Sequence, residues 1–102
     1  MAFLKKTPSI TVAELADKFI EKPVIVDVRE RFEYASGHIE GSQNVPLTKL
    51  KAFDFQERVY IICHSGARSK IATQYLYRRG YDVINVKGGL MKWNSVVPSR
   101  KV

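Results

Sequence analysis

One cysteine in the chain stands where its side chain can act as a nucleophile. Cys63 is the only cysteine among 102 residues. It follows the stretch 58–62, in which four apolar residues without polar alternation come after Arg58 and predict a buried strand. Ser69 is a favourable N-cap residue, so we expect a helix from there through about Arg79. Between the predicted strand and helix lies a short loop, which reads Cys63, His64, Ser65, Gly66, Ala67 and Arg68.

This order of strand, loop and helix predicts a site for an anion. Backbone N–H groups that lead into a helix point toward the carboxyl end of the preceding strand, where the helix dipole favours negative charge. The dipole and Arg68 would both favour the thiolate of Cys63, which is the reactive form of the side chain. Gly66 lets the loop turn tightly. The alternatives are an inert buried thiol and, for His64, a surface residue without a role; the position at a strand end favours a reactive Cys63.

The rest of the sequence predicts one α/β domain over residues 1–102, because short apolar runs alternate with helical patterns and no repeat or linker interrupts them. Thr11 and Glu14 form a capping box, which predicts a helix from Val12 toward Phe19 after a short strand at residues 9–10. Further expected elements are buried strands at 24–28 and 83–86, a short helix at 30–35, an irregular segment at 38–46, a short helix capped by Thr48 through about Phe53, a turn at Gly88 and Gly89, a helical turn at 90–93, and a flexible tail from about residue 98.

Composition restricts the class of partner. The net charge of +7 attracts nucleic acids, anionic membranes or small anions. The basic residues are scattered without interleaved aromatic residues, which favours a solvated surface over a nucleic-acid interface. No stretch approaches the roughly 20 apolar residues of a membrane span, and no leader pattern opens the chain. A lone cysteine cannot form an intramolecular disulfide, which fits a reducing compartment, so we expect a cytoplasmic protein. From the charge pattern and the lack of a span we expect that it binds neither nucleic acid nor membrane.

Several motifs together resemble those of single-domain rhodanese sulfurtransferases, and the resemblance extends from about Ser9 to Trp93. It implies a three-layer α/β fold whose mostly parallel sheet of about five strands carries helices on both faces. The loop from Cys63 to Arg68 resembles the active site of that family. The other matching motifs are Val26-Asp27-Val28-Arg29-Glu30, Glu33, Gly37-His38-Ile39, Gly41, Asn44-Val45-Pro46, and Gly88-Gly89-Leu90 with Trp93.

The resemblance implies that Cys63 is the nucleophile and carries transferable sulfur as a persulfide. Loop amides would hold the anionic sulfur, Arg68 would assist electrostatically, and Asp27 and Arg29 would support the site structurally. No metal or cofactor is implied. The expected partners are a small anionic sulfur donor and a thiol, cyanide-like or protein acceptor, with the protein a monomer or weak dimer. Many relatives that use thiosulfate have arginine where this chain has His64, so the donor stays open between thiosulfate and a persulfide. The residues that the resemblance implies as binding the persulfide or the substrate are His64, Ser65, Gly66, Ala67, Arg68 and Ser69.

Two other functions compete with sulfur transfer. A phosphatase or arsenate reductase would use a similar loop, but four residues separate Cys63 from Arg68, and the phosphatase loops that this one resembles are one residue longer. A reductase cycle also needs a resolving thiol, which this sequence lacks. A non-catalytic interaction module is the third hypothesis. Such modules often lose the cysteine, so the presence of Cys63, Gly66 and Arg68 together favours an enzyme.

Overall fold

The computed structural model describes residues 7–97, so the predicted flexible tail from residue 98 lies outside the described residues. The strands and the helices, of which η2 and η3 are of the 3-10 type, alternate along the chain as the sequence predicts. Their order is β1 Ser9–Thr11, α1 Val12–Lys18, η2 Phe19–Glu21, β2 Val24–Asp27, α2 Arg31–Ala35, β3 Gln43–Asn44, η3 Leu47–Ala52, β4 Val59–Ile62, α3 Ala67–Arg78, β5 Val83–Lys87 and α4 Gly89–Val96.

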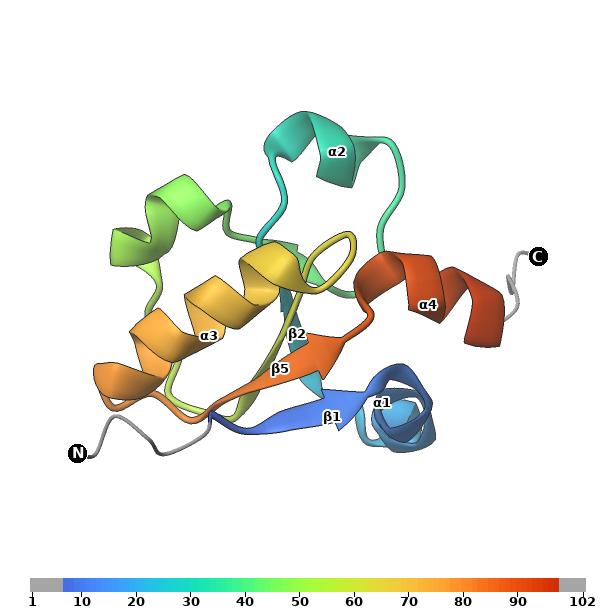
Figure 1. Ribbon diagram of the computed structural model, residues 1–102, viewed down its shortest axis with the longest axis horizontal. Coiled ribbons are helices and arrows are strands. Elements are labelled where there is room, and N and C mark those ends of the chain that lie inside the picture. The colour runs from blue at the N-terminus through green and yellow to red at the C-terminus, as the bar shows by residue number, and fades with distance from the viewer. Residues whose placement is uncertain (1–6, 98–102) are drawn as a thin grey trace.

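The strands form one five-stranded sheet in the order β1-β5-β4-β2-β3. Every neighbouring pair in it is parallel. Parallel neighbours need crossover connections, which the helices supply (Figure 1). β4 is the middle strand, and its carboxyl end, where Cys63 follows, lies at the same edge of the sheet as the carboxyl ends of β2 and β5. The predicted α/β fold with a five-stranded parallel sheet is confirmed, and this edge is where such folds bind ligands.

Side chains on the two faces of the sheet build two separate hydrophobic layers. Because successive residues of a strand point to opposite faces, β4 contributes Tyr60 and Ile62 to one layer and Val59 and Ile61 to the other. The first layer contains the buried residues of α1 and α4, which lie side by side (Figure 1). The second contains those of α3 and η3, and Cys63 belongs to it. Helices therefore cover both faces, as predicted.

Local signals in the sequence were right at α1 and wrong at Thr48 and in the segment 38–46. The capping box is present, since Glu14 N–H donates to Thr11 Oγ1 at 3.1 Å and Thr11 N–H donates to Glu14 Oε1 at 2.8 Å. Thr48 caps no helix, because η3 already begins at Leu47 after Pro46. The segment 38–46 is not wholly irregular, because β3 lies within it and pairs with the end of β2. Two residues at a sheet edge carry no periodic pattern from which to predict a strand.

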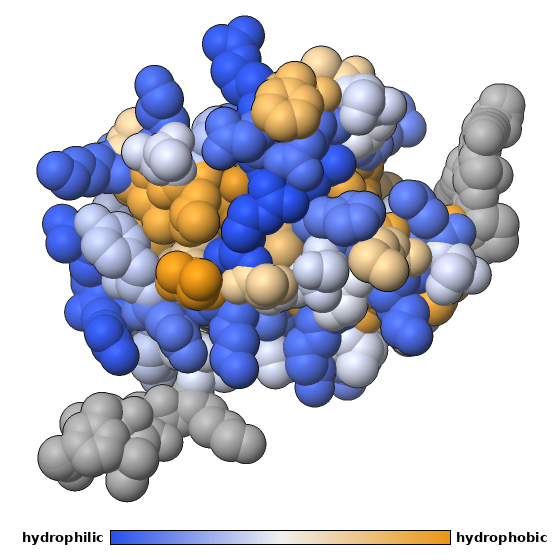
Figure 2. All heavy atoms as spheres, turned by 45° about the horizontal axis from the view of Figure 1, so that its top comes forward, coloured by the Kyte–Doolittle hydropathy of each residue, from blue (hydrophilic) through white to orange (hydrophobic). Residues whose placement is uncertain are grey.

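The molecular surface is largely polar. Figure 2 shows hydrophilic side chains over most of the visible face, with apolar atoms showing between them in separate patches. The large exposed apolar side chains include Phe32 on α2 and Met91 on α4. Between residues 7 and 97, no helix combines the length and the apolar character that crossing a membrane requires.

Candidate functional site

The sulfur of Cys63 lies at the carboxyl end of β4, completely buried, and accepts two backbone hydrogen bonds. Gly66 N–H donates to Sγ at 3.1 Å, and Ser69 N–H donates to it at 3.3 Å. The Ser69 hydroxyl oxygen lies 3.5 Å from Sγ. Hydrogen bonds to the charged form of a group favour that form, and both amides are oriented to stabilise negative charge on sulfur. The loop of residues 63–68, hereafter the Cys63 loop, thus has the geometry of an anion site.

The helix that follows begins earlier than the sequence predicts. We expected Ser69 to be the N-cap, but α3 starts at Ala67 with Gly66 as its N-cap, so that prediction is wrong. Gly66 adopts a φ of 108°, which side chains disfavour, and an added Cβ would lie 3.2 Å from Gly88 N. Ser69 therefore sits in the first turn of α3, fully buried, with its hydroxyl 3.2 Å from Gly66 O. This position is what directs the Ser69 amide at the sulfur.

A second helix supports the Cys63 loop from behind. At the start of α4, Leu90 N–H donates to the carbonyl of Cys63 at 2.9 Å and Met91 N–H donates to that of His64 at 3.0 Å. The predicted turn at Gly88 and Gly89 precedes these contacts. A Cβ on Gly89 would lie 2.4 Å from His64 O and 2.5 Å from Cys63 O, so only glycine fits there. The first amides of α4, which have no partner within their own helix, thereby fix the backbone of Cys63 and His64.

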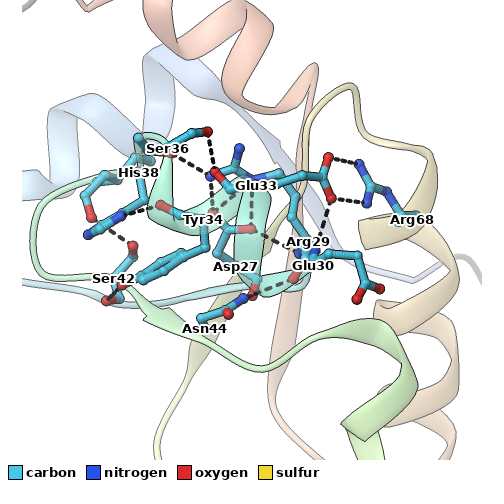
Figure 3. A network of polar contacts seen from close by, with 12 residues as sticks. Asp27, Arg29, Glu30, Glu33, Tyr34, Ser36, His38, Ser42, Asn44 and Arg68 are labelled. Carbon is cyan, nitrogen blue, oxygen red and sulfur yellow. Dashed lines mark hydrogen bonds and ion pairs between the residues drawn. The ribbon is translucent and has the colours of Figure 1, made fainter.

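Arg68 is paired with a residue that sequence reasoning did not select as part of the site. Its guanidinium donates to both carboxylate oxygens of Glu33 on α2, at 2.7 and 3.0 Å (Figure 3). Hydrogen bonds from Arg68, and then from the backbone of Glu30, lower the pKa of Glu33 to about 2. The same pair raises the pKa of Arg68. The available signal was the position of Glu33 within the matching motif, but spacing alone did not show that α2 meets the Cys63 loop.

Asp27 and Arg29 form a buried ion pair next to the site. Both are nearly inaccessible to solvent, and Arg29 Nη2 lies 2.9 Å from Asp27 Oδ2. Arg29 Nη2 also donates to the carbonyl of Gly37 at 2.7 Å. The Asn44 amide donates to the main-chain oxygens of Asp27 and Arg29, both at 2.9 Å. These contacts tie the end of β2 to the α2–β3 connection, and a buried charged pair is tolerated when its hydrogen bonds are made in this way.

A cavity of about 380 Å³ lies between the α2–β3 connection and α4, and the exposed His64 side chain forms part of its wall. Buried Ile39, Leu90 and Trp93 supply its apolar part. His38 is held in place by stacking on Tyr34, with ring centroids 3.7 Å apart, and by its Nδ1, which lies 2.7 Å from the Tyr34 carbonyl (Figure 3). Among residues 7–97, none of those that line the cavity carries a carboxylate. Its walls comprise Arg29, Ser36, Gly37, His38, Ile39, His64, Leu90, Trp93 and Asn94.

The structure brings most of the predicted site residues to one edge of the sheet. Gly66 and Ser69 direct amides at the sulfur, whereas His64, Ser65 and Ala67 are exposed around the loop. Among the described residues, 7–97, no group of three or more His, Cys, Asp or Glu side chains is arranged to hold a metal ion. The arrangement can stabilise negative charge on the Cys63 sulfur, because two backbone amides donate hydrogen bonds to it.

Sequence comparison places this geometry in a known family. The rhodanese-like domain family matches residues 11–96. The chain belongs to this family. One relative of this rhodanese-like protein, the uncharacterized protein YqhL of Bacillus subtilis (strain 168), is 38% identical over 85 residues, which cover 78% of this chain and 68% of YqhL.

Solved structures of rhodanese-like proteins have the same fold. A rhodanese-like domain protein from Staphylococcus aureus is 41% identical with a TM-score of 0.75, and the match covers 84% of this chain and 90% of that one. A thiosulfate sulfurtransferase from Pseudomonas aeruginosa is 30% identical with a TM-score of 0.76, and the match covers 87% of this chain and 19% of that one. The match to the second protein is thus confined to one part of a much longer enzyme.

Proposed function

We propose that this rhodanese-like protein is a sulfurtransferase that moves sulfane sulfur from an anionic donor, thiosulfate or a persulfide, to a thiol or cyanide-like acceptor through a Cys63 persulfide. The observation that carries the proposal is the pair of amides, from Gly66 and Ser69, that donate to Sγ at 3.1 and 3.3 Å. Donors in this position stabilise the charge of a thiolate before the reaction and of the same leaving thiolate after it. The family of the chain, whose members include the thiosulfate sulfurtransferase described above, supports the same reaction.

The reaction consists of two displacements at sulfur. The Cys63 thiolate attacks the sulfane sulfur of the donor, an S–S bond forms at Cys63, and the bond within the donor breaks. Its electron pair leaves with sulfite, or with a thiolate when the donor is a persulfide. The acceptor nucleophile then attacks the outer sulfur of the Cys63 persulfide, and the electron pair of the breaking S–S bond returns to Sγ. No net oxidant or reductant is required.

The cavity that His64 helps to line could bind the organic part of a thiol acceptor. A volume of about 380 Å³ lies within the ordinary range of small-molecule sites. Apolar walls from Ile39, Leu90 and Trp93 suit a carbon chain, and the lining histidines and the Asn94 amide suit a polar or anionic end group. His64, which directly follows Cys63 in the chain, forms part of the wall, so the cavity adjoins the Cys63 loop.

The experiment that tests the proposed function is intact-mass measurement. The purified protein is incubated with thiosulfate or with ethyl hydropersulfide, and we expect a gain of one sulfur atom that cyanide or ethanethiol then removes. Cys63→Ser is the matched control, because it is nearly isosteric but has no sulfur on which to form a persulfide. A phosphate ester should not be hydrolysed. If neither donor loads the protein, or if Cys63→Ser still transfers sulfur, the proposal is wrong.

A further inference from the structure

The cation of the Cys63 loop already has an anionic partner inside the protein. Arg68 donates one N–H to each carboxylate oxygen of Glu33, at 2.7 and 3.0 Å, in the two-bond geometry that suits a guanidinium and a carboxylate (Figure 3). About a third of the Arg68 side chain and a quarter of the Glu33 side chain remain exposed, at 33% and 25%. The pair is thus partly open to solvent, and its cation belongs to the Cys63 loop.

Glu33 keeps its negative charge whenever the enzyme works near neutral pH. Its pKa is lowered to about 2 by the hydrogen bonds from Arg68 and from the Glu30 backbone, so it is ionised throughout that range. Arg68 is also permanently charged. Two of the five N–H groups of the guanidinium point at Glu33. A donor anion can use the remaining ones, but it gains no net charge from the pair and lies beside a fixed carboxylate.

We propose that Glu33 sets the charge selectivity of the site, so that dianionic thiosulfate gains no electrostatic advantage over singly charged organic persulfides. This inference rests on the proposed sulfur transfer and concerns how the site discriminates between donors of different charge. Coulomb energy is proportional to the product of the two charges, so a carboxylate repels a dianion about twice as strongly in free energy as a monoanion at the same distance. Arg68 would by itself produce the opposite preference. Glu33 cancels that preference.

Glu33→Gln is the variant that tests this inference. The glutamine oxygen can still accept the hydrogen bond from Glu30 N–H, which Glu33 Oε1 now accepts at 2.9 Å, so the start of α2 is retained. The measured quantity is the ratio of the second-order rate constants for persulfide formation with thiosulfate and with ethyl hydropersulfide. If removal of the carboxylate speeds the monoanion about threefold, the dianion should gain about tenfold, and the ratio rises about threefold.

Two further variants separate charge selection from a structural role. Glu33→Asp keeps the charge and should leave the ratio near that of the wild type. Glu57→Gln removes a carboxylate that precedes β4, at the opposite end of that strand from Cys63, and should also leave the ratio unchanged. A merely structural Glu33 would slow both donors equally in Glu33→Gln.

The result that overturns the inference is an unchanged or lowered ratio in Glu33→Gln, or a ratio that rises equally in Glu57→Gln. Such a result leaves the proposed function in place, because both donors would still load Cys63. If the wild-type protein is loaded by neither donor, the proposed function fails and this inference fails with it. The two failures are thus distinguished by the wild-type mass measurement alone.

Discussion

The pH dependence of unfolding should reveal the Glu33–Arg68 pair. Glu33 has a folded pKa of about 2 against an ordinary value of 4.5, because Arg68 and the Glu30 backbone hydrogen-bond to its ionised form. A carboxylate whose pKa is lowered by folding stabilises the folded state above its unfolded pKa. That stabilisation is lost as the pH falls from about 4.5 to about 2. Glu33→Gln has no such titration, so the wild type and the variant should converge in strongly acidic solution.

The size of this effect follows from the pKa and the exposure. A pKa shift of one unit corresponds to about 1.4 kcal/mol, so the shift from 4.5 to about 2 gives an upper bound of about 3.5 kcal/mol for Glu33. The two side chains are 25% and 33% exposed, and solvent screening of such a pair reduces the expected contribution to about 1 kcal/mol. Urea unfolding at a series of pH values measures it. We expect Glu33→Gln to be less stable by about 1 kcal/mol above about pH 5, with the difference vanishing once the pH is below about 2.

A matched control is Glu57→Gln, since Glu57 is exposed and belongs to none of the ion pairs recorded between residues 7 and 97. This variant should unfold like the wild type at each pH. A stability difference between Glu33→Gln and the wild type that stays constant from neutral to strongly acidic pH would refute the reasoning, because only loss of a titrating ion pair makes the difference disappear in acid.

Three further substitutions, two of them with a matched control variant, test the packing and the cavity. Gly89→Ala should destabilise the fold by at least about 2 kcal/mol in urea unfolding, since its Cβ would meet two carbonyl oxygens at 2.4 and 2.5 Å. Its control is Gly80→Ala, because Gly80 also has a positive φ but a Cβ there would meet nothing within 4 Å. This control should lose only about 1 kcal/mol of stability. Asp27→Asn should cost about 3–5 kcal/mol, because Arg29 stays buried without its counter-charge. Asn94→Tyr should raise KM for ethanethiol several-fold but not for cyanide, and Ser95→Tyr, outside the cavity lining, should change neither. Equal losses of stability in Gly89→Ala and Gly80→Ala would contradict the packing argument, and equal changes of KM in Asn94→Tyr and Ser95→Tyr would contradict the assignment of the cavity.

The strand and helix pattern was predictable because buried strands and amphipathic helices leave periodic signals. The runs at 24–28 and 58–62 lack polar alternation since the sheet is covered on both faces. β3 left no signal, because a two-residue edge strand is held by main-chain pairing with Val26 and Asp27 rather than by a pattern of side chains. The cavity was also beyond prediction, since it depends on how closely α4 packs against the α2–β3 connection.

The partner of Arg68 shows the same limit at the level of single residues. The sequence placed Arg68 after Cys63 and Glu33 within a matching motif, but their separation of 35 positions gives no reason to join them. They meet because β2 and β4 are neighbours in the sheet, so the segments that leave their carboxyl ends emerge side by side. Local sequence patterns do not contain this topology. The sequence therefore suggested that Arg68 was an unpaired cation, whereas in the structure it forms a neutral pair with Glu33.

The misplaced cap of α3 shows why the cysteine and the glycine of the loop belong together. The first turn of a helix leaves N–H groups without partners, and an N-cap side chain ordinarily accepts the one from the third helical residue. Here that residue is Ser69, and Gly66, the N-cap, has no side chain to accept its N–H. Cys63 Sγ accepts it instead, at 3.3 Å.

N-cap preference pointed to Ser69 instead of Gly66. A side chain that caps a helix well would not leave the amide of Ser69 free to donate to the Cys63 sulfur. A serine at position 66 would offer its own hydroxyl to the Ser69 amide and so compete with Sγ for that donor. A serine there would also have to adopt a φ of 108°, a backbone conformation that side chains disfavour. Gly66 adopts this conformation while its N–H donates to the sulfur at 3.1 Å. The sulfur therefore occupies the place of the missing cap. Stabilisation of the start of α3 and stabilisation of negative charge on Cys63 use the same two hydrogen bonds.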